Sequence, residues 1–408
     1  MPEAVIVSVA RSPIGRANKG SLKDFRPDDL TALITKAALD KIPALDPTTI
    51  DDFILGCGLP GGESGNNMGR NIPVLLGYDE VPGTTITRYC ASSVQSTRMA
   101  FHAIKAGEGD TYVSAGVEMV SRFAKGTSDH WPDTKNPKFD EAMQRTTSTA
   151  EAGNAAGAWR DPREDGLLPD VYIAMGQTAE NVATMRGLDR QELDEFGVRS
   201  QNLAEKAIND GFWSREITPV TTPDGTVVDG DDGPRAGVTY DAIKDLKPVF
   251  RPDGVVTAGN CCPLNDGAAA VVIMSDTKAA ELGLTPLARI VSTGVSGLSP
   301  EIMGLGPVEA SKRALANAGM SIGDIDLVEI NEAFAAQVVP SYQDLGIDLD
   351  RLNVNGGAIA VGHPFGMTGA RLQNTMLNSL DYHDKSTGLI TMCVGGGMGM
   401  ALILERMS

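Results

Sequence analysis

Apolar positions in the first part of the chain form blocks that change from strand-like to helix-like spacing. Residues 4–10, AVIVSVA, are almost entirely apolar, which predicts a buried strand. Residues 28–42, DDLTALITKAALDKI, have apolar positions at helical spacing and begin with two acids, which suit a helix N-terminus. Residues 51–60, DDFILGCGLP, predict a second strand that ends in turn residues.

A helix rich in small residues is predicted just after Cys90. Its apolar residues at 94, 99, 101 and 104 are separated by small ones, and Gly107 is a suitable helix end. Residues 111–119, TYVSAGVEM, then predict a strand. Cys90 therefore lies where a strand-like segment turns into a helix.

The C-terminal part has a similar order of elements. Residues 308–320 predict a helix, and residues 325–330 predict a strand. The segment around His363 reads as a loop that leads into a helix, and residues 389–405, LITMCVGGGMGMALILE, read as a strand with glycines inside it. A reactive residue, a small-residue helix and a strand thus occur in this order twice. This order indicates two similar α/β halves, although no residue-level repeat accompanies it.

Two irregular stretches lie between these halves. Residues 121–170 are polar and rich in turn residues, and they are too long for an ordinary connection, so they predict a functional loop or small subdomain. Residues 222–241 predict an acidic, exposed excursion. Residues 175–211 between them carry two helical segments. A domain boundary is expected near 275–285, where a strand passes into a helix.

Composition narrows the classes of function. A chain of 408 residues exceeds a single hydrophobic core, so two or three domains are expected. Its net charge of −18 argues against nucleic acid or an anionic membrane as the main partner. We see no signal peptide and no apolar run near the ~20 residues of a membrane span. The odd count of five cysteines does not resemble a disulfide framework, so a reducing cytoplasm is the expected compartment.

Cys90 is the first candidate for chemistry. The unpaired N–H groups and positive potential at a helix N-terminus lower the pKa of a thiol and favour the thiolate. The alternative is a packing role, because free cysteine is among the most buried residue types. The sequence around Cys90 alone leaves both interpretations open.

Three further residues are candidates for acid–base or oxyanion chemistry. His363, flanked by Gly362 and Gly366, suits a general base that substrate approaches closely, and a loop histidine bonded to backbone is the alternative. Asn331 follows a predicted strand and could orient a water or a histidine near developing charge, or simply cap the next helix. Cys393 precedes a run of glycines whose bare backbone could approach a ligand.

The sequence gives less evidence of a chemical role for the remaining cysteines. Cys261 and Cys262 are adjacent, so they are poorly placed for an unstrained disulfide, and no closely spaced pair completes a zinc site. We interpret them as packing residues at a ligand wall and Cys57 as structural. No metal is predicted.

Four motifs resemble the thiolase family and occur in its order. They are CASS at the start of a helix, NEAFAAQ, GGAIAVGHPFGMTGAR and CVGGGMGMAL. RSPIG near the start, MGQTAEN, and TAGN with LNDGAAA extend the resemblance over essentially the whole chain. Thiolases exchange acyl groups with coenzyme A, either by cleaving 3-ketoacyl-CoA or by joining two acyl-CoA molecules.

The resemblance implies a role for each candidate. Cys90 is similar to the acylated nucleophile, His363 to the base that generates its thiolate, and Cys393 to the thiol that moves a proton at the acetyl α-carbon. Asn331 resembles the residue that holds a water beside His363, forming one oxyanion hole. The backbone N–H groups of Cys90 and Gly395 resemble the second hole.

The resemblance also implies a pantetheine tunnel and its lining. Met175, Phe250, Met303 and Phe334 match the family's lining positions, and Cys262 stands at a fifth position of this lining. Two positions depart from the family pattern. Cys262, beside Pro263, replaces a serine that contacts pantetheine in many relatives. Ala174 stands where members specific for acetoacetyl-CoA often have histidine, which weakens a strictly short-chain synthetic interpretation.

The expected fold is thiolase-like α/β, with two similar halves in five layers and an inserted loop domain. We expect residues 1–120 and 251–278 to form the N-terminal half, 121–250 the loop domain and 279–408 the C-terminal half. The family implies a homodimer or homotetramer that acts on acyl-CoA and CoA without another cofactor. The expected activity is thiolysis of 3-ketoacyl-CoA in a β-oxidation-like pathway. The alternatives are acetoacetyl-CoA synthesis and a non-catalytic acyl-CoA or lipid-binding relative.

Overall fold

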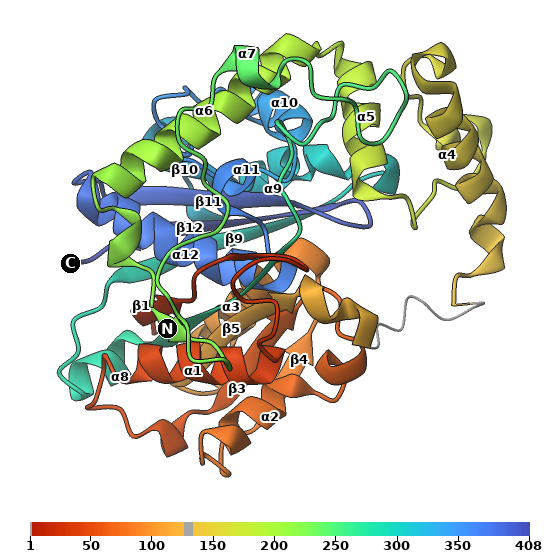
Figure 1. Ribbon diagram of the computed structural model, residues 1–408. Helices are drawn as coiled ribbons and strands as arrows, with labels where there is room; N and C mark the ends of the chain where they lie inside the picture. The colour runs from red at the N-terminus through yellow and green to blue at the C-terminus, as the bar shows by residue number, and fades with distance from the viewer. Residues whose placement is uncertain (1, 126–133) are drawn as a thin grey trace.

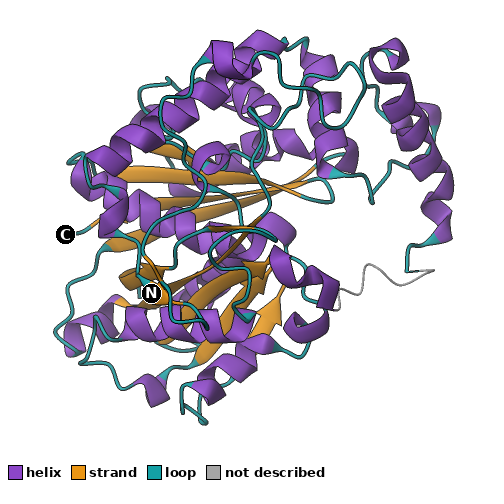
Figure 2. Cartoon of the chain, in the orientation of Figure 1, coloured by secondary structure: helices purple, strands orange, loops and turns teal. Residues whose placement is uncertain are grey.

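Long apolar runs form the central strands of the molecule. The computed structural model describes residues 2–125 and 134–408. Within this part, ten strands join in one mixed sheet with the order β10-β11-β12-β9-β1-β8-β5-β3-β4, and β2 pairs with β8. Figure 2 shows the strands and the helices that cover them. The strands are β1 (Ala4–Arg11), β2 (Gly15–Arg16), β3 (Asp52–Cys57), β4 (Gly83–Ile86), β5 (Thr111–Met119), β8 (Asn265–Ser275), β9 (Ala288–Gly297), β10 (Leu327–Ile330), β11 (Thr387–Val394) and β12 (Met398–Arg406).

The sheet consists of two halves that meet at one short junction. In the N-terminal half β3 runs parallel to β4 and β5, and in the C-terminal half β10 runs parallel to β11. Strands β1 and β9 join the halves through only two residue pairs, Val5 with Arg289 and Ile6 with Ala288. The two predicted halves are therefore present, and a hydrogen-bonded junction connects their sheets.

Helices alternate with the two half-sheets (Figure 1). Helices α1 (Pro27–Leu39) and α2 (Met68–Leu75) pack on the N-terminal half-sheet, and α9 (Gly306–Ala318) packs on the C-terminal one. Helices α3 (Ser92–Ala106) and α12 (Phe365–Tyr382) contact each other between the half-sheets. The layers therefore follow the order expected for the fold class, helix, sheet, helix, sheet, helix.

The side-chain pattern of β12 explains why this layering is stable. Met400, Leu402 and Leu404 belong to the core between the half-sheets, whereas Ala401 and Ile403 belong to the core beneath α9. Successive side chains of a strand point to opposite faces, so an uninterrupted apolar run has both faces buried. Strands covered by helices on both sides need such a run.

The glycine-interrupted segment at 389–405 differs from our expectation of a single strand. Strands β11 and β12 are antiparallel partners, with Val394 opposite Met398. Gly396 and Gly397 between them have φ values of +78° and +80°. Two consecutive left-handed residues form the turn that matches strand twist in a hairpin, and glycine adopts this conformation without steric cost. The glycines therefore reverse the chain.

Most of the remaining helices lie in the upper half or at the right of the molecule in Figure 1, whereas residues 276–281 lie at its lower left. Strands β6 (Val220–Thr221) and β7 (Val227–Val228) form a separate small pair. None of the described helices is both long and apolar enough to cross a membrane. The α-helices not yet named are α4 (Asp140–Ala152), α5 (Met175–Arg186), α6 (Arg190–Asn209), α7 (Tyr240–Ile243), α8 (Asp276–Glu281), α10 (Ala335–Leu345) and α11 (Ala358–Val361).

The acidic excursion at 222–241 is less exposed than expected. The carboxylate of Asp231 accepts hydrogen bonds from the buried guanidinium of Arg11 at 2.8 and 3.0 Å and from the N–H of Ile14 at 2.7 Å. The side chain of Asp231 is only 3% exposed. This ion pair fastens the excursion to β1. The predicted domain limits stay a prediction, and residues 126–133 of the predicted loop domain lie outside the described residues.

Candidate active site

Cys90 lies in a single 3₁₀ turn, Tyr89–Ala91, between β4 and α3. Tyr89 has a φ of +44°, a left-handed conformation that is strained for a bulky residue. Ser92 holds the turn, because its hydroxyl donates to the carbonyl of Tyr89 at 2.6 Å and accepts from the N–H of Arg88 at 2.9 Å. The turn places the Cys90 thiol at the start of α3, as the sequence predicts.

The electrostatic expectation for Cys90 is wrong. Burial raises the pKa of its thiol to about 12, and the charge of Glu118 adds to this effect. Interactions of the thiol with the backbone N–H groups of Gly395 and of Cys90 itself lower the pKa and oppose the rise. Desolvation outweighs the helix N-terminus here, so the resting group is a thiol. The two N–H groups favour the thiolate but do not offset burial.

The hairpin between β11 and β12 supplies the first of these donors. Gly395 is the residue after β11 and begins the turn. Cys393 lies two residues earlier, is fully buried, and interacts electrostatically with Cys90, which contributes to the raised pKa of Cys393 after burial. Cys262 interacts with both thiols. The structure thus brings Cys90, Cys393, Gly395 and Cys262 together, and all five cysteines are free thiols.

His363 is held in one orientation by Thr368. The Nδ1 atom lies 2.7 Å from the Thr368 hydroxyl, and that hydroxyl donates to the carbonyl of Pro364 at 2.7 Å. A hydroxyl has one proton to donate, so it must accept from Nδ1–H. Nε2 is then unprotonated and available as a base.

Asn331 lies beside this base, as predicted. Its Nδ2 atom is 3.3 Å from Nε2 of His363, and its Oδ1 is buried without a hydrogen-bond partner among the described residues. The capping alternative is wrong, because Phe334 occupies the N-cap position of α10. Asn331 therefore has no role in starting the helix, and its amide faces the histidine.

His363 is neutral over the physiological range. Burial lowers the pKa of its imidazole to about 3, and the nearby positive charge of Arg371 contributes. The His363 side chain is 1% exposed, and its backbone N–H donates to Asn265 at 2.9 Å. A neutral, fixed imidazole that carries its proton on Nδ1 can accept a second proton at Nε2.

The Cys90 thiol opens into a cavity of about 350 Å³. Phe365, whose ring packs edge-on against His363 with centroids 5.3 Å apart, lines this cavity and so connects it to the histidine. A neighbouring cavity of about 520 Å³ shares Lys135, Tyr172 and Ile173 with it. The lining of the first cavity is mainly apolar and consists of Gly58, Leu59, Tyr89, Cys90, Thr134, Lys135, Val171, Tyr172, Ile173, Met175, Phe365, Gly395 and Gly396.

The predicted substrate contacts gather in one hydrophobic cluster. This cluster also contains Cys393, and its predicted members are Met175, Phe250, Cys262, Met303 and Phe334. Phe250 and Phe334 pack edge-to-face at 6.2 Å, and the N–H of Cys262 donates to the carbonyl of Ala333 at 3.0 Å. Met175 lines the Cys90 cavity and Phe250 the neighbouring one, whereas Met303 is 1% exposed.

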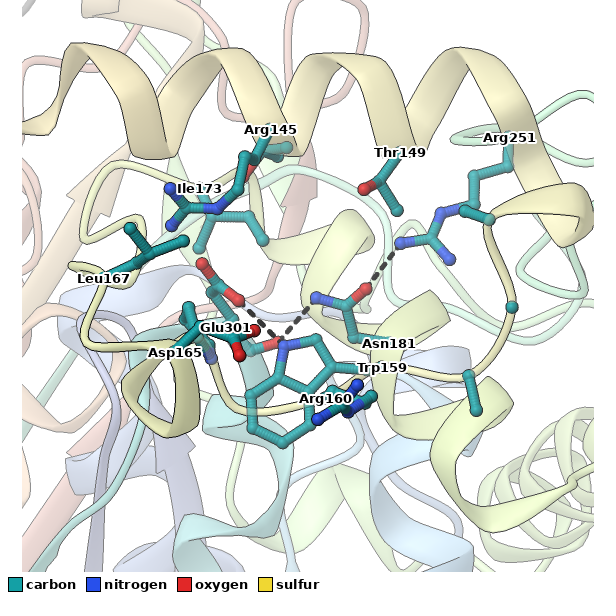
Figure 3. Close-up of a pocket in the computed structure, with 15 residues that line it drawn as sticks. Arg145, Thr149, Trp159, Arg160, Asp165, Leu167, Ile173, Asn181, Arg251 and Glu301 are labelled. Carbon is teal, nitrogen blue, oxygen red and sulfur yellow. Dashed lines mark hydrogen bonds between the residues drawn. The ribbon is translucent and has the colours of Figure 1, made fainter.

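A third cavity of about 260 Å³ lies beneath α4 (Figure 3) and shares Ile173 with the other two. Trp159 donates from Nε1 to Glu301 at 2.8 Å, and Arg251 donates to the amide oxygen of Asn181 at 2.6 Å. The amide nitrogen of Asn181 donates to the backbone carbonyl of Glu301 at 2.9 Å. None of the predicted site residues lines this cavity. Its polar groups bond mainly to one another, and they stabilise the region around α5.

Sequence reasoning missed three residues of the site. Thr368 fixes the tautomer of His363, Tyr89 adopts the strained turn, and Glu118 raises the pKa of Cys90. Glu118 carried a usable signal, since it is a lone acid in the otherwise uncharged strand segment TYVSAGVEM. Thr368 and Tyr89 carried none, because their roles depend on contacts and dihedral angles.

Comparison with known proteins finds matches along nearly the whole chain. The family model for the N-terminal domain of thiolase matches residues 4–277, and the model for the C-terminal domain matches residues 284–406. The 3-ketoacyl-CoA thiolase of Bacillus subtilis is 41% identical and covers 99% of this chain and 100% of its own.

Two further relatives carry different names. An acetyl-CoA acetyltransferase of Cupriavidus necator is 42% identical, and a 3-oxoadipyl-CoA/3-oxo-5,6-dehydrosuberyl-CoA thiolase of Escherichia coli is 41% identical, each over 100% of both chains. The crystal structure of the Bacillus anthracis acetyl-CoA acetyltransferase superposes with a TM-score of 0.85 at 35% identity, covering 100% of this chain and 99% of that one. The chain belongs to the thiolase family.

Proposed function

We propose that the protein is a 3-ketoacyl-CoA thiolase that works through an acyl-Cys90 intermediate. The observation that carries this proposal is that Cys90 and Gly395, whose backbone N–H groups would form the oxyanion hole, line the same mainly apolar cavity. Donors placed where negative charge develops are often the largest contribution to acyl-transfer catalysis. Relatives named 3-ketoacyl-CoA thiolase at 41% and 40% identity support the substrate class.

In the proposed first half-reaction, Nε2 of His363 takes the proton of the Cys90 thiol. The thiolate attacks the 3-keto carbon of the substrate, and the N–H groups of Cys90 and Gly395 stabilise the resulting oxyanion. The bond between carbons 2 and 3 then breaks, which leaves the shortened acyl group on Cys90. The departing acetyl-CoA enolate takes a proton from Cys393, while Asn331 and a water stabilise its oxygen.

In the second half-reaction, the thiol of CoA loses its proton to Cys393 and attacks the acyl-Cys90 thioester. The shortened acyl-CoA leaves, and Cys90 recovers its proton from His363. The buried, unpartnered Oδ1 of Asn331 supports a bound water in this scheme, because a buried acceptor without a donor is costly. Each group returns to its starting protonation state.

Acylation of Cys90 provides the test. Incubation with acetyl-CoA should add one acetyl group to the intact mass, and peptide mapping should place it on Cys90. Cys90→Ser is the matched control, since it keeps the size of the side chain and should remain unlabelled. A label on another residue, with Cys90 free, would contradict the proposal.

Synthesis of acetoacetyl-CoA from two acetyl-CoA is the reverse use of the same residues. The names of the Cupriavidus necator and Bacillus anthracis relatives favour this second candidate. Initial rates in both directions at matched concentrations separate the two. A non-catalytic binding role would instead give no acyl-enzyme.

Assembly and compartment are part of the same proposal. We expect a homodimer or homotetramer in the cytoplasm, acting on acyl-CoA and CoA with no other cofactor. Light scattering of the purified protein gives the oligomer mass directly, and a monomeric mass would contradict this expectation.

A further inference from the structure

Glu118 is a buried acid next to the site to which the proposed mechanism gives no task. It lies near the end of β5 and is 1% exposed. Its Oε2 accepts hydrogen bonds from the backbone N–H groups of Gly58 at 2.7 Å and Gly366 at 2.8 Å, and its Oε1 accepts from Leu59 at 3.2 Å. No lysine, arginine or histidine in the described part of the chain forms a salt bridge with it.

The three N–H groups belong to two segments. One follows β3 and lies next to the Cys90 turn, and the other begins α12, close to His363. Gly58 and Leu59 follow β3 and line the Cys90 cavity. The carbonyl of Gly58 accepts a hydrogen bond from the hydroxyl of Thr87 at 2.8 Å, and that hydroxyl accepts from the N–H of Tyr89 at 3.3 Å. The carboxylate is thus connected to the turn that holds Cys90 by three successive hydrogen bonds, through Gly58 and Thr87.

The other segment begins α12. Gly366 is three residues after His363, and its N–H is one of the unpaired donors of the helix N-terminus. A carboxylate at this position also meets the positive end of the helix dipole. Glu118 therefore joins the segment behind the nucleophile to the segment that carries the base.

The fit around this carboxylate is close. A Cβ atom at Gly58 would lie 2.5 Å from Oε2 of Glu118, and one at Gly366 would overlap the carbonyl oxygen of Val117. Both segments can approach the carboxylate only because they have glycine at these positions. The two segments also pack against each other here, since a Cβ atom at Gly58 would lie 2.8 Å from Cβ of Phe365.

Charge gives Glu118 a second effect. Among the described residues, the titratable groups that interact with it are the thiols of Cys57, on β3 at 3.8 Å, and Cys90, at the start of α3. Burial raises the pKa of Glu118 to about 7, and the three N–H groups oppose this rise. When ionised, the carboxylate disfavours a thiolate at Cys90.

We propose that Glu118 is a positioning residue that holds the Cys90 turn and the His363 loop at a fixed spacing, and that its negative charge, when present, adds to burial in disfavouring the Cys90 thiolate. The two functions predict opposite effects on two measurements. Loss of the charge should make Cys90 more reactive toward a small alkylating agent, whereas loss of the spacing should slow turnover. If Glu118 only supported folding, its replacement would lower both the reactivity of Cys90 toward the alkylating agent and the turnover rate.

Glu118→Gln in the full-length protein tests the charge. Iodoacetamide labelling of the Cys90 peptide, measured by mass spectrometry against pH, should have a midpoint about one pH unit lower than in the wild type. Thiolysis kcat should fall by about ten- to a hundredfold with the KM for CoA unchanged, because small misplacements of reacting groups cost rates of this order. Glu301→Gln, another buried glutamate that accepts a backbone N–H, is the matched control and should leave the midpoint unchanged.

Glu118→Asp tests the spacing separately. It keeps the charge but is one methylene shorter, so the labelling midpoint should stay near the wild-type value while kcat falls.

A wild-type kcat in Glu118→Asp would overturn the positioning role, and an unchanged midpoint in Glu118→Gln would overturn the electrostatic role. If Glu118→Gln does not fold, a labelling midpoint in Glu118→Asp well below the wild-type value overturns the electrostatic role. The turnover readout rests on the proposed function, but labelling needs no substrate and so separates the two ideas.

Discussion

At the scale of single residues, hydrogen bonds around His363 decide which of its nitrogens can react. The Thr368 hydroxyl is committed to the carbonyl of Pro364, so it can only accept from Nδ1–H. The neighbouring amide of Asn331 then faces the unprotonated Nε2. The tautomer required of a base is thus fixed by a residue that touches no substrate.

Replacing Thr368 by valine should release this constraint. Thr368→Val keeps the shape but removes the acceptor for Nδ1–H, so both tautomers become populated and kcat should fall roughly tenfold or more. Thr368→Ser keeps the hydroxyl and is the matched control. Steady-state kinetics measure the effect, and ¹⁵N chemical shifts of the imidazole report the tautomer. A valine variant with wild-type kcat and one tautomer would show that another group orients the ring.

The two buried thiols should also be separable. Acylation of Cys90 from acetyl-CoA needs a thiolate and an oxyanion hole, but no proton transfer at the α-carbon. Carbon–carbon cleavage needs the departing enolate to be protonated, and acid–base assistance of this kind contributes about 10²–10⁴ in rate. Cys393→Ala should therefore still acetylate Cys90 while losing most of its thiolysis activity.

Deuterium exchange checks the same point independently. Cys393→Ala should lose exchange of the acetyl-CoA methyl protons with deuterated water, while Cys57→Ala, which changes another buried thiol, should retain it. Thiolysis by Cys393→Ala at nearly the wild-type rate would mean that Cys393 only packs and that the proton moves through His363 or water.

At the scale of elements, the sequence predicts most helices and strands because their signals are local. Strand β5 has the predicted limits, and α3 ends at Gly107, which has the left-handed φ of +75° expected of a helix end. The order of elements around Cys90 and His363 is also confirmed. The hairpin at 395–397 was missed because its apolar flanks read as one run. Its reversal depends on two positive φ angles that composition does not encode.

Part of the site could likewise be predicted, and part could not. The motifs identify Cys90, His363, Asn331, Cys393 and Gly395 as residues to examine. The high pKa of Cys90 could not be predicted, because it depends on how fully the fold removes water from the thiol and on a carboxylate distant in sequence. The ion pair of Arg11 with Asp231 was missed for the same reason, since its partners are far apart in the chain.

The hairpin glycines should differ in their tolerance of a side chain. A Cβ atom at Gly397 would overlap the carbonyl oxygen of Leu298, and its φ of +80° disfavours any other residue. One at Gly395 would only touch Tyr89 and the sulfur of Met175, at 3.4 and 3.5 Å. Gly397→Ala should therefore lower the free energy of unfolding by more than ~1 kcal/mol, and Gly395→Ala should leave it nearly unchanged. Urea unfolding measures both, and equal losses would contradict this account of the turn.

At the scale of the whole molecule, the proposed site is shared between the two halves. Cys90 comes from the N-terminal half, His363 and Cys393 come from the C-terminal half, and α5 contributes Met175 to the cavity wall. The central helices α3 and α12 bring the two reactive segments to one place. Neither half contains a complete set of groups.

The cavity formed by these parts should favour acyl chains longer than acetoacetyl. Its volume of about 350 Å³ and mainly apolar lining leave room beyond a two-carbon acyl group, and Ala174 leaves more space than histidine would in the neighbouring cavity. We expect kcat/KM for 3-ketoacyl-CoA thiolysis to rise above its four-carbon value as the chain lengthens. A series of chain lengths measures this, with Ile173→Trp as a variant that narrows the wall and should shift the preference back. A sharp optimum at four carbons in the wild type would favour the synthetic alternative.

The position of β1 has a consequence for how the chain is made. β1 leaves the ribosome long before its partner β8, because Ala4 pairs with Ser275. β8 lies between β1 and β5 in the sheet. β1 and β5 therefore cannot join one sheet until β8 has been synthesised. At ~5–20 residues per second, synthesis through residue 275 takes roughly 15–55 seconds, and such non-local pairing is intrinsically slow to form. The apolar segment AVIVSVA therefore lacks its partner strand β8 throughout that time. We expect chaperones that recognise exposed apolar strands to bind the nascent chain.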